Sequence, residues 1–158
     1  LQWGPMRQPQ PLAPQTEAAA VTPMPAPAPE PAVLNDAQSR RLQGYSARGH
    51  RLLSERLAAA REELHHSPDD RYSIELFETE NSDPARMERF LIRARELVPL
   101  EELLVIPVAS AGHYRLRVLY GAFASRDEAT AAGKRLPPKY QQAFRTSVRS
   151  FGELRREI

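Results

Sequence analysis

Residues 71–151 contain four strand-like segments separated by helix signals, and this order constrains the fold more than any other feature of the chain. In the clearest segment, 113–120, apolar residues alternate with Arg115 and Arg117. A period of two residues is typical of a half-buried β-strand. We expect the apolar side of this strand to lie on a core, the two arginines to lie on the opposite face, and Gly121 to mark the end of the strand.

The other three strands are predicted from similar patterns. They are 72–78, 102–108 and 144–151. Pro107 indicates that the second of them lies at a sheet edge, because proline lacks the N–H that a central strand donates to its neighbour.

Two helices separate these strands. Asp83 is a good N-cap residue, and Pro84 suits the first position of a helix. The second helix is expected to begin after Ser125, which forms a capping-box pattern with Glu128, and to end before Pro137.

The resulting order is β-α-β-β-α-β, an α+β fold with a four-stranded antiparallel sheet and both helices on one face. We expect the first and third strands at the centre and the fourth beside the first. The apolar residues expected to face the helices are Ile74, Leu76, Leu116, Val118, Thr146 and Val148. The pattern leaves no element for the second face of the sheet. The residues expected there are Ser73, Glu75, Phe77, Arg115, Arg117, Leu119, Arg145, Ser147 and Arg149.

This second face has two interpretations. In one, it is an ordinary solvated surface on which Glu75 pairs with arginines across the strands, each pair contributing about 0.2–1 kcal/mol. In the other, it is a binding platform, because arginine forks, a carboxylate and an exposed aromatic ring suit a flat polar ligand.

Two further segments precede the sheet domain, which is predicted to span 71–158. Residues 1–35 form a Pro/Ala-rich linker, with nine of the 15 prolines of the chain in its first 31 residues. Residues 36–70 form an amphipathic helix and a connector. Gly44 and Gly49 weaken the first half of this helix. Its apolar stripe either packs on the sheet domain, pairs with another helix or belongs to another domain.

Composition excludes several classes of site. The chain of 158 residues has no cysteine, so a disulfide scaffold, a thiolate metal site and a cysteine nucleophile are excluded. No run approaches the roughly 20 apolar residues of a membrane helix. His65 and His66 are adjacent and therefore diverge on a helix, which makes them poor joint metal ligands. We expect neither a metal nor a cofactor.

The order and spacing of several short motifs resemble a SPOR domain over about residues 71–151. These motifs are Tyr72-Ser73-Ile74-Glu75-Leu76, Tyr114-Arg115-Leu116, Gly121-Ala122-Phe123, Ser125, Glu128-Ala129 and Leu136-Pro137. The resemblance implies the fold already reached and a non-catalytic role in binding bacterial peptidoglycan. It implies glycan strands stripped of their stem peptides, as at division septa. It also implies a periplasmic location and a tether to the inner membrane upstream of residue 1.

The resemblance places the glycan site on the sheet. The expected contact residues are Ser73, Glu75, Phe77, Arg115, Arg117, Arg145, Ser147 and Arg149. An arginine would hold the lactyl carboxylate of N-acetylmuramic acid in a charge-assisted contact, and Phe77 would stack on a sugar ring. The family often has Gln where this chain has Glu75.

Three other functions compete with glycan binding. The helix before the sheet and the sheet itself could form a protein-interaction module that recruits an envelope or divisome partner. RNA binding needs aromatic residues exposed within the strands, and only Phe77 is a candidate, so we expect no nucleic-acid partner. Glycan hydrolysis needs a pair of carboxylates in distinct environments, and Glu75 has no acidic neighbour in the predicted platform, so we expect no enzyme activity.

Overall fold

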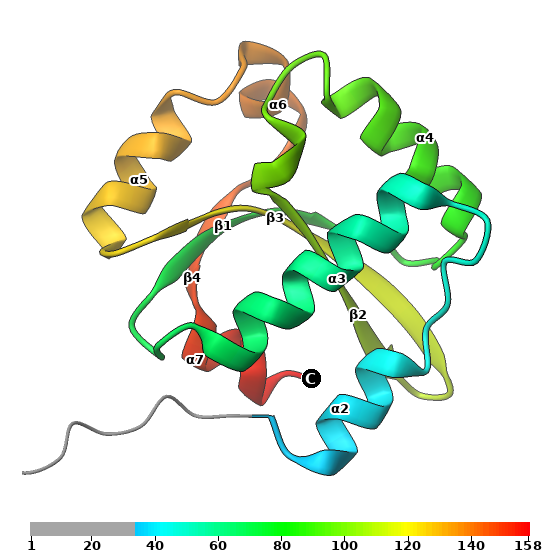
Figure 1. The fold of residues 1–158 in the computed structure, drawn as a ribbon. Helices are drawn as coiled ribbons and strands as arrows, with labels where there is room; N and C mark the ends of the chain where they lie inside the picture. The colour runs from blue at the N-terminus through cyan, green and yellow to red at the C-terminus, as the bar shows by residue number, and fades with distance from the viewer. Residues whose placement is uncertain (1–33) are drawn as a thin grey trace, which may run out of the picture. The chain divides into compact units, whose positions relative to one another are not determined.

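Four antiparallel strands form a sheet in the order β2-β3-β1-β4, as the sequence predicts. A computed structural model describes residues 34–158, and Figure 1 gives the labels used below. The strands are β1 (Tyr72–Glu78), β2 (Leu103–Ser110), β3 (His113–Phe123) and β4 (Ser147–Ser150). Strand β2, which contains Pro107, lies at an edge, as predicted. The predicted linker lies outside the described residues, apart from its last two.

Six α-helices accompany the sheet in the described part of the chain. They are α2 (Asp36–Gln43), α3 (Arg51–His66), α4 (Pro84–Ala94), α5 (Arg126–Lys134), α6 (Pro138–Ala143) and α7 (Phe151–Arg156), with a short 3₁₀ turn at Leu100–Glu102. Both predicted N-caps are confirmed. The side chain of Asp83 accepts from the N–H of Ala85 at 3.1 Å, and the hydroxyl of Ser125 accepts from the N–H of Glu128 at 3.1 Å.

Helices α4 and α5 cover one face of the sheet, as predicted (Figure 1). The buried residues that form this core include Ile74, Leu76, Met87, Leu91, Leu116, Val118, Ala129 and Ala132. Val148 packs against the same core, whereas Thr146 is exposed and precedes β4. The apolar alternation of β1 and β3 therefore fixes which face the helices take.

The second face of the sheet is also covered, and the prediction that it lies open is wrong. A second buried cluster joins strand residues to residues of α2, α3 and α7. Its members are Leu34, Leu42, Ala60, Leu64, Leu104, Ile106, Leu119, Phe151 and Leu154. The predicted strand 144–151 is shorter than expected, because Ser150 ends β4 and caps α7 in a capping box with Glu153. Figure 1 shows α7 and the C-terminus close to α2.

The predicted helix 36–66 forms two helices with a break at residues 44–50. Helix α3 lies against β2 and contacts both α4 and α7. Of the three outcomes that the sequence left open for its apolar stripe, packing on the sheet domain is therefore the correct one. Gly49 in the break has φ of 86°, a conformation that glycine adopts without strain.

A register shift in the pairing of β1 with β3 changes the face on which two residues lie. Glu75 pairs with Leu119 but Phe77 pairs with Val118, so one extra residue stands in β1 between them. As a result Phe77 packs on the side of α4, not on the second face, and Glu78 pairs opposite Arg117. The strict alternation predicted for β1 holds through Leu76 and is wrong at Phe77 and Glu78.

A second irregularity lies within β3. Gly121 has φ of 79°, and the pairing with β1 shifts register around it. Glycine adopts this conformation at little cost. The strand continues to Phe123, so the prediction that Gly121 ends it is wrong.

Helix α7 is also anchored by a buried arginine. Arg155 is only 3% exposed; its guanidinium pairs with Asp69 and donates to the carbonyl of Leu64 at 3.1 Å. Both partners belong to the end of α3 or the connector after it, so this contact ties α7 to that corner of the fold.

We predict that Leu154→Ala lowers the free energy of unfolding by about 2–5 kcal/mol, because Leu154 is fully buried between α7 and the sheet. Urea denaturation measures the change. Leu97→Ala is the control, since Leu97 is 40% exposed. Equal, small effects of the two substitutions would contradict the covered second face.

Candidate functional site

The eight residues expected to contact a ligand divide into three groups in the structure. Ser73 is fully buried, and its hydroxyl donates to the carbonyl of Tyr120 at 3.2 Å. Three residues are enclosed in ion pairs: Glu75, Arg117 and Arg149. Four retain access to solvent: Phe77, Arg115, Arg145 and Ser147.

Arg117 on β3 is the centre of an ion-pair network on the second face. Its Nη1 lies 2.6 Å from an Oε of Glu157, and its Nη2 lies 3.0 Å from an Oε of Glu78. Its Nε lies 3.3 Å from an Oε of Glu75, close enough for an ion pair but without hydrogen-bond geometry. Only 11% of its side chain is exposed, so solvent screens these pairs less than it screens pairs at an open surface.

Arg149 on β4 completes this network. Its guanidinium contacts Glu75 at 2.8 Å, Glu153 at 3.4 Å and also Glu157. Burial acts to lower the pKa of Arg149, but the neighbouring glutamates, led by Glu157, raise it overall. Arg149 therefore stays charged. We call the seven residues Glu75, Glu78, Arg115, Arg117, Arg149, Glu153 and Glu157 the arginine–glutamate network.

The network attaches α7 to the sheet. Glu153 lies in α7 and Glu157 directly follows it, whereas Arg117 lies on β3 and Arg149 on β4, the two strands that flank β1. The backbone N–H of Ser150 donates to Glu153 at 3.2 Å, and this hydrogen bond is the main cause of a lowered pKa of Glu153. The glutamates of α7 and the C-terminal turn thus occupy the arginines that the sequence indicated as ligand contacts.

The accessible members of the predicted site gather at the end of the sheet where β1 finishes. Arg115 is 44% exposed and pairs with Glu78, the last residue of β1, at 3.1 Å. Phe144 stacks on Phe77 with ring centroids 4.8 Å apart, so Arg145, the next residue, lies at the same end. Arg145 is exposed and forms no ion pair with any residue from 34 to 158.

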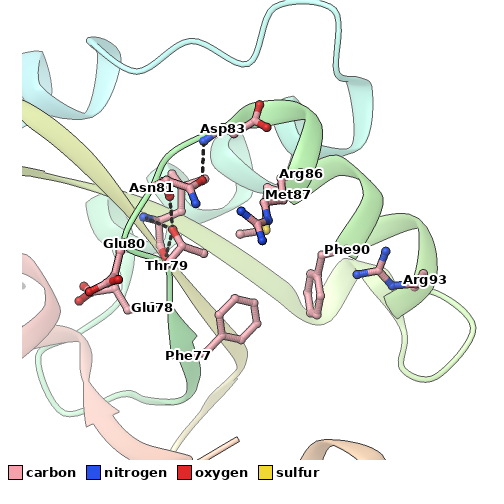
Figure 2. Close-up of a pocket in the computed structure, with 11 residues that line it drawn as sticks. Phe77, Glu78, Thr79, Glu80, Asn81, Asp83, Arg86, Met87, Phe90 and Arg93 are labelled. Carbon is pink, nitrogen blue, oxygen red and sulfur yellow. Dashed lines mark hydrogen bonds between the residues drawn. The ribbon is translucent and has the colours of Figure 1, made fainter. Parts of the chain in front are cut away.

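A groove of about 490 Å³ opens at this end, on the side of α4 (Figure 2). We call it the Phe77 groove. Its lining includes Phe77, Glu78, Asn81, Arg86, Phe90 and Arg93, together with other residues of the loop between β1 and α4. The rings of Phe77 and Phe90 lie edge to face, with centroids 5.0 Å apart. The groove is not predicted from the sequence, because the register shift in β1 leaves no break in the residue pattern.

Metal coordination has no support in the described part of the chain, where no three His, Asp or Glu side chains gather as ligands. Helices in the same part are too short or too polar to cross a membrane. The side chains that gather at this end of the sheet include arginines, carboxylates and aromatic rings.

Comparison with protein families matches residues 82–147 to the model of the SPOR domain. The match runs from two residues before α4 to the first residue of β4, and over these residues it confirms the resemblance predicted from the sequence. The SPOR domain is a peptidoglycan-binding family. Neither the curated proteins nor the solved structures gave a match to the chain.

Glu75→Gln is predicted to lower the free energy of unfolding by about 1–3 kcal/mol, because Arg117 and Arg149 both lose a charged partner in a site that is largely shielded from solvent. Chemical denaturation of the two proteins measures the difference. Glu96→Gln, at an exposed position without an ion pair among residues 34–158, is the control. A Glu75 variant as stable as the control would show that the network contributes no net stability.

The lowered pKa of Glu153 predicts a pH dependence of stability. Its native pKa lies below the ordinary value of 4.5, so its contribution is present above pH 4.5 and is lost as the pH falls through the native pKa. Glu153→Gln should therefore make stability fall less steeply on acidification below pH 4.5. Thermal unfolding at a series of pH values tests this, and parallel curves for wild type and variant would refute it.

Proposed function

Since residues 82–147 match the SPOR domain model, we propose that this chain binds peptidoglycan glycan strands without cleaving them. The proposed ligand is the strand stripped of its stem peptides, as found at division septa. The proposed role is to bring a larger envelope protein to those strands from the periplasm, with the tether to the inner membrane lying outside the residues described. The match to the SPOR domain model is the observation that carries this proposal.

The ligand chemistry suits the accessible residues. A stripped glycan presents hydroxyl and N-acetyl groups, and each N-acetylmuramic acid has a free lactyl carboxylate. Arg115 and Arg145 are exposed guanidinium groups at one end of the sheet. Arginine binds a carboxylate in charge-assisted, often bidentate contacts, and Ser147, also exposed, offers a hydroxyl group.

We assign the enclosed residues a supporting role in this proposal. Arg117, Arg149 and Glu75 hold α7 on the second face, so a ligand would reach them only if α7 moved. Ser73 is buried beneath the same face. The proposed direct contacts are therefore the accessible residues Phe77, Arg115, Arg145 and Ser147. The other four residues of the predicted set stabilise the structure of that end of the sheet.

The arrangement of carboxylates favours binding over hydrolysis. A glycosidase needs one carboxyl group that stays protonated near neutral pH and a second that is ionised. In the arginine–glutamate network every glutamate contacts an arginine, and the pKa of Glu153 is lowered. Ionised, paired glutamates of this kind are suited to stabilising the fold or to orienting hydrogen-bond donors.

A protein partner is the second candidate function. It is favoured by Ile92 on α4 and Leu97 after it, which are 42% and 40% exposed. Phe77 was the one aromatic residue that could have stacked on an RNA base from the second face of the sheet. It packs on the side of α4 instead, so the structure does not favour RNA binding.

Sacculus pelleting of the 158-residue chain tests the proposed function. We expect more of the chain to pellet with sacculi that an amidase has stripped of stem peptides than with untreated sacculi. The variant Arg115→Ala/Arg145→Ala should lose affinity for stripped sacculi by about tenfold or more, because each charged hydrogen bond contributes about 1.5–3 kcal/mol. The matched control is Arg40→Ala/Arg48→Ala, which removes two exposed arginines elsewhere. A chain that stays in the supernatant with both kinds of sacculi would disprove the proposal, and equal losses in both variants would show non-specific charge attraction.

A further inference from the structure

We propose that the Phe77 groove is a saccharide subsite that recognises N-acetylmuramic acid, with its lactyl carboxylate held by Arg86 and Arg93. This inference rests on the proposed function for the class of ligand, but it concerns a surface on the side of α4, away from the covered second face. None of the residues that would hold the carboxylate belongs to the set indicated by the sequence.

The spacing of residues on α4 builds one wall of the groove. Arg86, Phe90 and Arg93 stand at positions i, i+4 and i+7 and so share one face of the helix. Figure 2 shows the two guanidinium groups on either side of the Phe90 ring. Neither arginine forms an ion pair with a described residue, so both remain available to an anion.

The opposite wall carries acceptors for hydroxyl groups. Glu78 and Glu80 lie at the β1 end of the groove, apart from the arginines (Figure 2). The charge of Glu78 is balanced by Arg115 and Arg117, while Glu80 is exposed. A ligand with an anion at one end and hydroxyl donors at the other matches this separation of charge.

An aromatic surface lies between the two walls. Phe77 and Phe90 are half-buried and both line the groove. Phe144 and Tyr140 pack behind them, with Phe77 stacked on Phe144 and Phe90 roughly parallel to Tyr140, so the rings are held in position. An apolar surface of this kind packs against the C–H face of a sugar ring, and the volume of the groove falls within the ~300–1,000 Å³ typical of ligand pockets.

The groove also adjoins the exposed arginines of the proposed function. Glu78 lines the groove and pairs with Arg115, and Phe77 touches Phe144, which precedes Arg145. A glycan strand is a polymer and could therefore engage the groove and one of these arginines at neighbouring sugars. This continuity favours a glycan over a small isolated anion.

Helix α4 supplies a matched pair of variants for the test. Arg86→Ala/Arg93→Ala removes the two arginines of the groove, and Arg89→Ala/Arg95→Ala removes two exposed arginines of the same segment that do not line it. Both variants change the net charge equally and replace exposed side chains. Circular dichroism and the thermal midpoint verify that each variant is folded.

Pelleting of the full chain with amidase-stripped sacculi gives the first readout. We expect the groove variant to bind about tenfold more weakly than wild type and the control variant to bind within about twofold of it. Equal binding by the groove variant and wild type, or equal losses in the two variants, would overturn the inference while leaving the proposed function intact. Failure of the wild type itself to pellet would instead overturn the proposed function, and the inference with it.

NMR titration of the full chain with soluble N-acetylmuramic acid and N-acetylglucosamine gives the second readout. We expect the amide signals of residues 77–93 to shift with N-acetylmuramic acid, and the shifts to weaken strongly with N-acetylglucosamine and in the groove variant. Equal shifts with both sugars would contradict recognition of the carboxylate by the arginines.

Discussion

The ion-pair network between the sheet and the C-terminal segment decides which surfaces this domain presents. Arg117 and Arg149 lie on the second face of the sheet, and Glu157 bridges both of them from the end of α7. Glu75 compensates the two arginines from within the sheet. Because Arg117, Arg149 and Glu75 are largely shielded from water, losing one of them would leave the other charges uncompensated at considerable cost. The network and the buried apolar cluster of α2, α3 and α7 together cover the second face.

Because the second face is covered, the ligand contacts that we propose lie at the end of β1. The exposed Arg115 and Arg145 lie at this end, near a groove that contains two further arginines and two aromatic rings. The SPOR domain match supports a peptidoglycan ligand, and the chemistry at this end suits an acidic amino sugar. The proposed site thus keeps the kinds of residue that the sequence indicated, arginine and aromatic, but places them largely on the other side of the sheet.

The sequence predicts most of the fold correctly because its alternation and capping signals are local. The strand order, the helices on the first face and the N-caps at Asp83 and Ser125 follow from them. The side of Phe77 could not be predicted, since an extra residue in β1 is a matter of pairing between strands. The sequence contains two signals that the second face is covered, and the prediction did not use them. Strand β2 is apolar on both faces, with Leu104 and Ile106 opposite its other core residues, and Ser150 with Glu153 has the capping-box spacing.

The most direct test of this account is a crystal structure of the chain with a stripped glycan oligosaccharide. The account predicts a muramic acid residue in the Phe77 groove, its carboxylate within hydrogen-bonding distance of Arg86 or Arg93, with α7 still seated on Arg117 and Arg149. An oligosaccharide bound across the second face, with α7 displaced and the groove empty, would contradict it.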